Sequence, residues 1–135
     1  MKEMTFKATI ENTAAAVAFV ESALEEAGCP MKMLMQINVA MDEVFVNIAS
    51  YAYAPGEGDA TIRFELDEET HVAQITLIDQ GVAFDPLNAP EPDITKPAAE
   101  RPIGGLGIFL VRKLMDEVTY ERKDGCNILT LRKKI

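Results

Sequence analysis

The stretch that most constrains the fold is residues 31–53, MKMLMQINVAMDEVFVNIASYAY, which has the periodicity of a helix. At 100° per residue, one set of mostly polar residues falls within roughly 40° of Gln36, because positions three and four apart share a helix face. This stripe consists of Gln36, Ala40, Glu43, Asn47 and Ser50. Apolar residues flank it, with Ile37, Met41, Val44 and Ile48 on one side and Met35, Val39 and Val46 on the other. We therefore expect solvent around Asn38 and Asp42, and the stripe pointing into the protein.

The place of Glu43 in that stripe favours a functional role. A carboxylate buried without a partner is costly, so Glu43 is expected to meet a metal, a polar ligand or a cavity with ordered water. The alternative is that Glu43 and Asn47 are structural residues whose polar atoms are satisfied by backbone groups. The helix alone favours neither interpretation.

Length and charge narrow the classes of protein. The chain has 135 residues, of which 48% are hydrophobic, so we expect residues 1–135 to form a single domain with a two-layer core. Its net charge of -9 argues against nucleic acid binding. No apolar run approaches the roughly 20 residues of a membrane span and no signal peptide is evident, so we expect a cytoplasmic protein with no membrane contact. Cys29, Cys126 and the lone His71 do not form a zinc motif, and the cysteines are expected to be reduced.

The rest of the chain alternates between strand and helix patterns. Period-two alternation predicts strands over residues 4–10, 60–66, 71–79, 118–123 and 126–132. Further helices are predicted from Asn12 or Thr13 to a left-handed Gly28, and after the glycines at 104–107. Hairpins with helices between them indicate an α+β fold, a two-layer sandwich in which helices cover one face of a mixed, largely antiparallel sheet.

Two loops carry further signals. The strand ending at Asp79 changes abruptly to DQGVAFDP, which is either a simple turn or a side-chain acceptor held at a pocket rim. A proline-rich loop over residues 87–102 has the length of a lid. It leads into Gly104-Gly105-Leu106-Gly107 at the start of a helix, where bare amides and the helix dipole suit a phosphate, although a hinge without a ligand is the alternative. The spacing fits neither a P-loop nor a Rossmann fingerprint.

These signals stand in a fixed order that resembles the histidine-kinase-like ATPase superfamily. MDEVFVNIASYAY, DQGVAFDPL and GGLGIFLVRKLMDEVTY look like the bacterial anti-sigma factor serine kinases, and the resemblance spans nearly the whole chain. It implies a Bergerat-type ATP-binding fold and the cofactors ATP and Mg²⁺. A general base, a metal and positioned phosphates are the parts that phosphoryl transfer requires.

The resemblance also implies a role for each matched residue. Glu43 corresponds to the general base, Asn47 to the Mg²⁺ ligand and Asp79 to the acceptor for the adenine amino group. Gly81 is expected to let the adenine ring approach closely, and the backbone amides of Gly105 and Gly107 are expected to contact the phosphates. The chain departs from the family where Ala83 replaces the second glycine of DxGxG and where Tyr51 replaces a histidine. The family's phosphate-contacting threonine has a single candidate in the last strand, Thr130.

The function implied is that of a protein serine kinase that phosphorylates an anti-anti-sigma protein and sequesters a sigma factor, as a homodimer. The alternative is a binding module in which nucleotide organises a partner surface and Glu43 transfers no phosphate. A detached sensor histidine kinase domain is disfavoured, because the chain has neither dimerisation helices nor a placed phosphoacceptor histidine.

Overall fold

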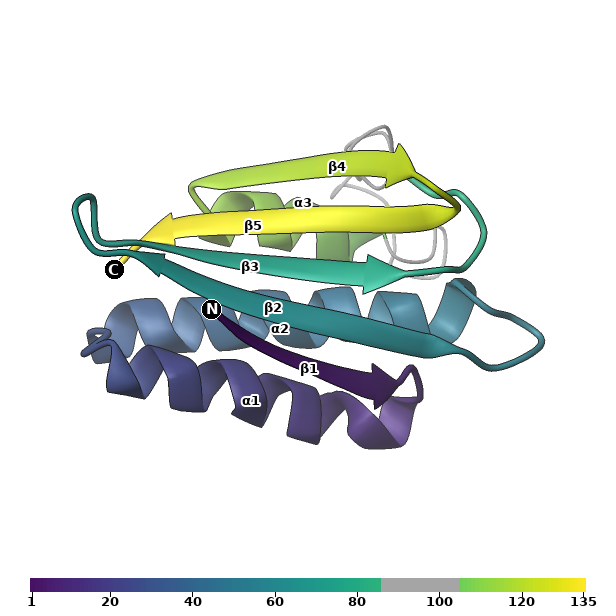
Figure 1. The fold of residues 1–135 in the computed structure, drawn as a ribbon, viewed down its shortest axis with the longest axis horizontal. Helices are drawn as coiled ribbons and strands as arrows, with labels where there is room; N and C mark the ends of the chain where they lie inside the picture. Colours follow the sequence, from purple (N-terminus) through teal and green to yellow (C-terminus); the bar gives the residue numbers. More distant parts are fainter. Residues whose placement is uncertain (86–104) are drawn as a thin grey trace.

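The computed structural model describes residues 1–85 and 105–135 and has the predicted two-layer architecture (Figure 1). The strands are β1 (Lys2–Lys7), β2 (Asp59–Asp67), β3 (Val72–Asp79), β4 (Glu117–Lys123) and β5 (Cys126–Lys134). The helices are α1 (Thr13–Glu26), α2 (Met31–Tyr51) and α3 (Gly105–Leu114), with a short 3₁₀ helix η1 (Ile10–Asn12) before α1. The predicted lid over residues 87–102 and the glycine at 104 lie outside the described residues.

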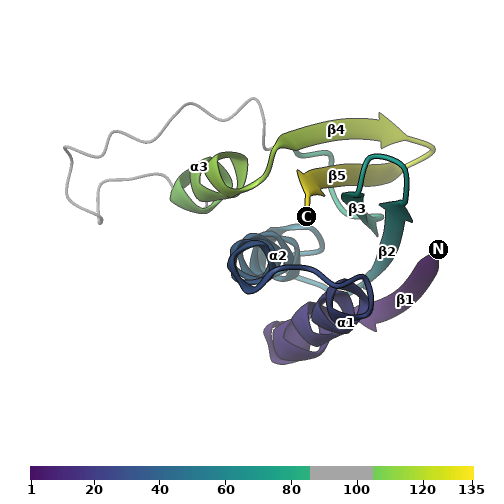
Figure 2. The same cartoon turned by 90° about the vertical axis from the view of Figure 1, so that its left-hand side faces the viewer.

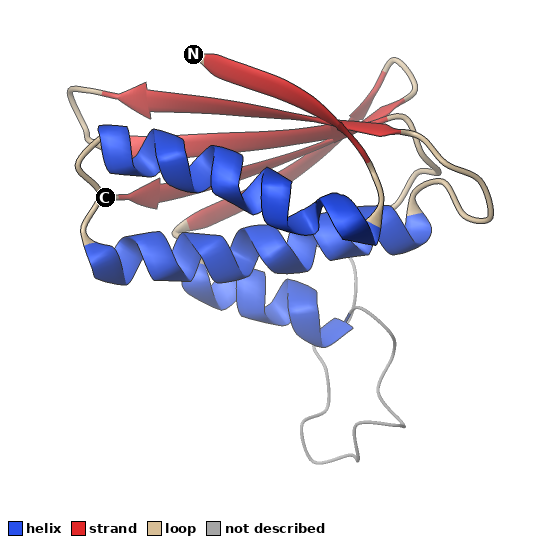
Figure 3. Ribbon diagram, turned by 90° about the horizontal axis from the view of Figure 1, so that it is seen from below, coloured by secondary structure: helices blue, strands red, loops and turns tan. Residues whose placement is uncertain are grey.

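The five strands form one sheet in the order β1-β2-β3-β5-β4, and all four pairings are antiparallel. Buried and half-buried residues alternate along β3 and most of β5, as expected where one face of a sheet meets the core. The three helices lie side by side on that face (Figures 2 and 3). The α+β sandwich predicted from the sequence is therefore confirmed.

Helix α2 lies between α1 and α3 and supplies the centre of the core. The flank predicted to be apolar, Ile37, Met41, Val44 and Ile48, is buried. Phe45 is fully buried and packs edge-on against Phe6 of β1, with ring centroids 6.4 Å apart. Among residues 1–85 and 105–135, no helix is both long enough and apolar enough to cross a membrane.

On the second apolar flank of α2, Met35 and Val39 do not enter the core as the sequence pattern predicted. Met35 and Val39 are 60% and 43% exposed, while Glu43 and Asn47 are half-buried rather than enclosed. The reason is that the core contacts α2 on the Ile37 side only, so the polar stripe faces sideways toward α3 and its far flank faces solvent. Asp42 is exposed as predicted. The other residue expected in solvent is half-buried, since Asn38 has a buried Oδ1 that finds no hydrogen-bond partner within the described part of the chain.

Several element ends also differ from the prediction. The first strand ends at Lys7 instead of residue 10, because the Asn12 side chain donates a hydrogen bond to the Lys7 carbonyl (2.8 Å) and closes a turn there. Helix α2 ends at Tyr51, two residues early, and β5 extends two residues past its predicted end. Strand β3 begins one residue late because His71 has a φ of 58°. Gly28 has the predicted left-handed conformation, with a φ of 73°.

Candidate functional site

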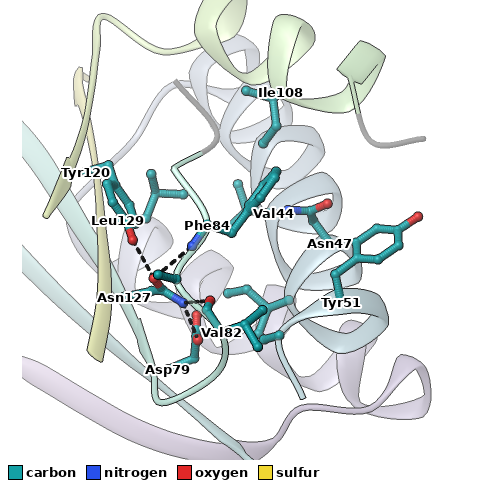
Figure 4. Close-up of a pocket in the computed structure, with 13 residues that line it drawn as sticks. Val44, Asn47, Tyr51, Asp79, Val82, Phe84, Ile108, Tyr120, Asn127 and Leu129 are labelled. Carbon is teal, nitrogen blue, oxygen red and sulfur yellow. Dashed lines mark hydrogen bonds between the residues drawn. The ribbon is translucent and has the colours of Figure 1, made fainter. Parts of the chain in front are cut away.

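A pocket lies between the second half of α2, the segment after β3, the first turn of α3 and the β4–β5 hairpin (Figure 4). It holds about 620 Å³ of atom-free space, part of it open to solvent. Its lining is mainly apolar and consists of Val44, Asn47, Ile48, Tyr51, Ala52, Asp79, Val82, Ala83, Phe84, Ile108, Tyr120, Asn127 and Leu129. Apolar walls with a few polar groups suit a flat heteroaromatic ring.

Asp79 lies at the floor of this pocket and is only 5% exposed. The alternation of β3 places it on the face that the helices cover. Its Oδ1 accepts hydrogen bonds from the Gly81 N–H and from Asn127 Nδ2, each at 2.9 Å. Within the described residues Oδ2 accepts none, so it is available to a ligand. Asp79 therefore closes the turn through Oδ1 and also lines the pocket, while its role as the acceptor for a ligand stays a prediction.

Gly81 is required by the packing of the protein itself. A Cβ built on it would lie 2.2 Å from the Ala52 carbonyl oxygen, so a side chain cannot be placed there without moving backbone. The next residue, Val82, donates its N–H to the same carbonyl at 2.9 Å. The glycine thus allows the segment after β3 to lie directly against the C-terminal end of α2. The close approach of an adenine ring to Gly81 stays a prediction.

Glu43 and Asn47 occupy successive turns of α2 on the side that faces α3. A Cβ built on Gly107 would lie 2.6 Å from Glu43 Oε2, so the absence of a side chain at this position is what admits the carboxylate. Glu43 is not among the pocket-lining residues, whereas Asn47 is. Gly105 is the first residue of α3, at the helix end where backbone N–H groups lack helical partners.

The sequence did not identify Asn127, which is 7% exposed and contacts Asp79 directly. The two residues are opposite each other in the antiparallel pairing of β3 with β5. A usable signal was present, because Asn127 shares the period-two face of Leu129 and Leu131, where a polar residue is unexpected. The predicted Thr130 lies on the other face of β5 and does not line the pocket.

Tyr53 holds the segment after β3 from the side of α2. Its hydroxyl donates to the Asp59 carbonyl (2.6 Å) and accepts from the Gln80 N–H (2.7 Å). Burial raises the pKa of the Tyr53 phenol, and the nearby Asp79 and Asp59 carboxylates raise it further, against the opposing effect of the Gln80 hydrogen bond. The phenol therefore stays neutral at physiological pH and keeps both contacts.

The residues present fit a Mg²⁺ ion only as a partner of phosphate. In the described part of the chain, no three His, Cys, Asp or Glu side chains converge on a metal site. The Asn47 amide lines the pocket and makes no hydrogen bond to another described residue, so its oxygen is available. Mg²⁺ keeps several waters and is commonly held by one or two protein oxygens together with substrate phosphates. Asn47 would hold the ion, whose charge would neutralise phosphate oxygens.

Comparison with known proteins gives a consistent result. The family described as "Histidine kinase-like ATPase domain" matches residues 6–133. The serine/threonine-protein kinase BtrW of Bordetella bronchiseptica is 32% identical over 100 residues, which cover 74% of this chain and 70% of that protein. The serine-protein kinase RsbW of Bacillus cereus is 34% identical over 97 residues, which cover 69% of this chain and 59% of that protein.

A solved structure supports the fold alone. The histidine kinase domain of a blue-light activated histidine kinase from Erythrobacter litoralis matches with a TM-score of 0.61 and 16% identity, over 90% of this chain and 60% of that one. The resemblance inferred from the three motifs is confirmed by the family match and by the two kinase relatives. The chain belongs to the histidine kinase-like ATPase domain family.

Proposed function

We propose that this chain is an ATP- and Mg²⁺-dependent protein serine kinase that phosphorylates an anti-anti-sigma protein and sequesters a sigma factor. The observation that carries the proposal is the layout of the site. An acceptor, Asp79, lies at the closed end of an apolar pocket, and a polar pair, Glu43 and Asn47, lies on α2 next to the glycine start of α3. In this arrangement Asp79 would face the adenine ring, Asn47 the metal-bound phosphates and Glu43 the reacting γ-phosphate.

The pocket floor would bind adenine. Asp79 Oδ2 is an acceptor, and the exocyclic amino group of adenine is a donor, so the two are complementary. Guanine presents a carbonyl oxygen at the same ring position, which would leave two acceptors facing each other. The apolar side chains of Ile48, Val82 and Leu129 supply the walls against which the ring packs.

Glu43 would act as the general base. Its carboxylate accepts the proton of the substrate serine while the serine oxygen bonds to the γ-phosphorus, and the bond from that phosphorus to the β,γ-bridging oxygen breaks to release ADP. The amides of Gly105 and Gly107 are suited to the phosphates, because a helix N-terminus presents free N–H groups and a positive dipole end. Gly107 also leaves room for the Glu43 carboxylate.

The partners come from the resemblance to anti-sigma factor kinases. The two kinase relatives are named for protein serine or serine/threonine phosphorylation. The chain spans 59% of the RsbW relative, so its substrates, its sigma factor and its homodimeric state are all part of the proposal. A nucleotide-gated binding module without transfer is the competing function, and the experiment below separates the two.

The test compares Glu43→Gln with Asp42→Asn, its exposed neighbour on α2. Melting temperature, ATP affinity and phosphate transferred to serine of the antagonist are measured for both variants and the parent. A general base is worth on the order of 10²- to 10⁴-fold, so Glu43→Gln should lose that much transfer while it keeps its fold and ATP affinity. Asp42→Asn should behave as the parent. A parent that binds ATP but labels no antagonist would favour the binding module.

The assignment of the nucleotide end has its own test. Asp79→Asn places an amide at the pocket floor, where its N–H₂ group opposes the adenine amino group, so ATP affinity should fall. Asn47→Ala should weaken the dependence of ATP binding on Mg²⁺ and leave metal-free binding close to the parental value. Equal affinities of the parent for ATP and GTP, measured by calorimetry, would contradict the role of Asp79.

A further inference from the structure

Asn127 is the centre of a hydrogen-bond network that the proposed chemistry does not use. Its Nδ2 group donates to Asp79 Oδ1 (2.9 Å) and to the Val82 carbonyl (2.8 Å). Its Oδ1 accepts from the Tyr120 hydroxyl, from Arg122 Nη1 (3.2 Å) and from the Phe84 N–H (3.4 Å). An amide group has two N–H donors and one acceptor oxygen, so the Asn127 side chain is fully satisfied.

The hydrogen-bond partners of Asn127 determine which way its amide faces: the Phe84 N–H donates to the oxygen, and the Val82 carbonyl accepts from the nitrogen. A guanidinium group has only donors, so Arg122 requires an acceptor and fixes the amide oxygen on the β4 side. The Tyr120 hydroxyl donates to the same oxygen. The amide nitrogen must then face Asp79. Because the Gly81 N–H also donates to Asp79 Oδ1, that oxygen carries two hydrogen bonds and Oδ2 is the one left for a ligand.

The same network also holds the backbone segment beside the proposed adenine site. Arg122 Nη1 donates to the Gly81 carbonyl at 2.8 Å, and Asn127 donates to the carbonyl of the next residue, Val82. The β4–β5 hairpin therefore fixes both the carboxylate of Asp79 and the segment that follows it. Asn127 and Arg122 lie outside the motifs that suggested the family.

We propose that Asn127, oriented by Tyr120, Arg122 and the Phe84 N–H, is a positioning residue that makes the pocket select a purine with an amino group over one with a carbonyl group. The inference rests on the proposed function, since it requires that the pocket binds a nucleotide base. Without the Asn127 amide nitrogen, Asp79 Oδ1 loses a donor, so Oδ2 is no longer held as the only free acceptor. Selectivity is then lost while the pocket keeps its shape.

One variant is Tyr120→Phe combined with Arg122→Met, which removes the two side-chain donors to the amide oxygen and leaves Asn127 and the Phe84 N–H in place. Arg122 is exposed and Tyr120 lies on the edge strand, so the fold should tolerate both changes. The decisive variant is Asn127→Leu, which removes the amide itself at similar volume. Thr119→Val, an exposed change on β4, is the matched control.

Calorimetry would measure the affinities for ATP, GTP and purine riboside triphosphate, which lacks the amino group. In the parent, ATP should bind best. A buried acceptor left without its partner costs about 5- to 100-fold in affinity, so the variants should lose that factor for ATP. Purine riboside triphosphate should bind parent and variants alike, because it never made the contact. The ratio of ATP to GTP affinity should fall in the variants and stay parental in Thr119→Val.

The possible outcomes distinguish the role proposed for Asn127 from nucleotide binding by the pocket. Equal losses for all three nucleotides, accompanied by a lower melting temperature, would show a structural role and overturn the inference while ATP binding stands. Parental selectivity in both variants would also overturn it. A parent that binds no nucleotide would remove the proposed function and the inference together.

Discussion

The contact between Gly107 and Glu43 allows fold and catalysis to be perturbed separately. In Gly107→Ala the new Cβ would lie 2.6 Å from Glu43 Oε2, where an ordinary contact begins at 3.4 Å. The two atoms must therefore separate by about 0.8 Å. The cheapest movement is a rotation of the flexible glutamate, since Gly107 lies in the first turn of α3 and its backbone is compatible with alanine.

The expected effects on stability and on transfer have opposite signs. Alanine is favoured over glycine in a helix by up to about 1 kcal/mol, so the melting temperature should hold or rise slightly. A misplacement of about 1 Å at a reacting group costs on the order of 10²-fold in rate, which corresponds to about 2.7 kcal/mol of transition-state stabilisation. ATP affinity should be nearly unchanged, because alanine keeps the backbone N–H.

The assay is a double-mutant cycle with Gly107→Ala and Glu43→Gln, read out as phosphate transferred to serine at saturating ATP. If Gly107→Ala acts by displacing the carboxylate, the double variant should be no slower than Glu43→Gln alone. Ser22→Ala, an exposed helix change in α1, controls for added helix propensity. Parental transfer in Gly107→Ala would refute the reasoning, and multiplicative losses would show that Gly107 acts independently of Glu43.

Two further predictions concern the segment after β3. Gly81→Ala should cost about 1–3 kcal/mol, because its Cβ would press on the Ala52 backbone, and urea unfolding would measure the loss. Unchanged stability would mean that the backbone there moves freely. Tyr53→Phe should cost about 1–3 kcal/mol by leaving the Asp59 carbonyl and the Gln80 N–H unpaired. Because the pKa of Tyr53 is raised on folding from 10.0, the parent should lose this stabilisation as the pH rises above about 10, and the variant should lack that loss.

Local patterns in the sequence were sufficient for the elements of this protein. The helical spacing of α2, the period-two alternation of the strands and the left-handed Gly28 depend on neighbours a few residues apart, and each is present in the structure. The same patterns placed Asp79 at the end of a strand, as the structure has it. The order of the three motifs was enough to predict the family and with it the two-layer fold.

The orientation of α2 was decided by tertiary packing. Apolar residues flank the polar stripe on both sides, so periodicity alone could not say which flank meets the sheet. The structure buries Met41 and leaves Met35 60% exposed, because α2 lies between two helices and touches the sheet on one side only. Glu43 is therefore a half-buried residue facing α3, rather than one enclosed by the core.

The contacts that build the site join residues far apart in the chain. Asp79 meets Asn127 because β5 pairs with β3 in a register that places them opposite each other. Gly81 meets Ala52, and Gly107 meets Glu43, through close approaches that depend on how whole elements pack. Strand order, register and helix packing arise from the summed burial of many side chains, so no local stretch encodes them. The sequence by itself determined which chemical groups the site contains, and only the tertiary structure decided which of them touch.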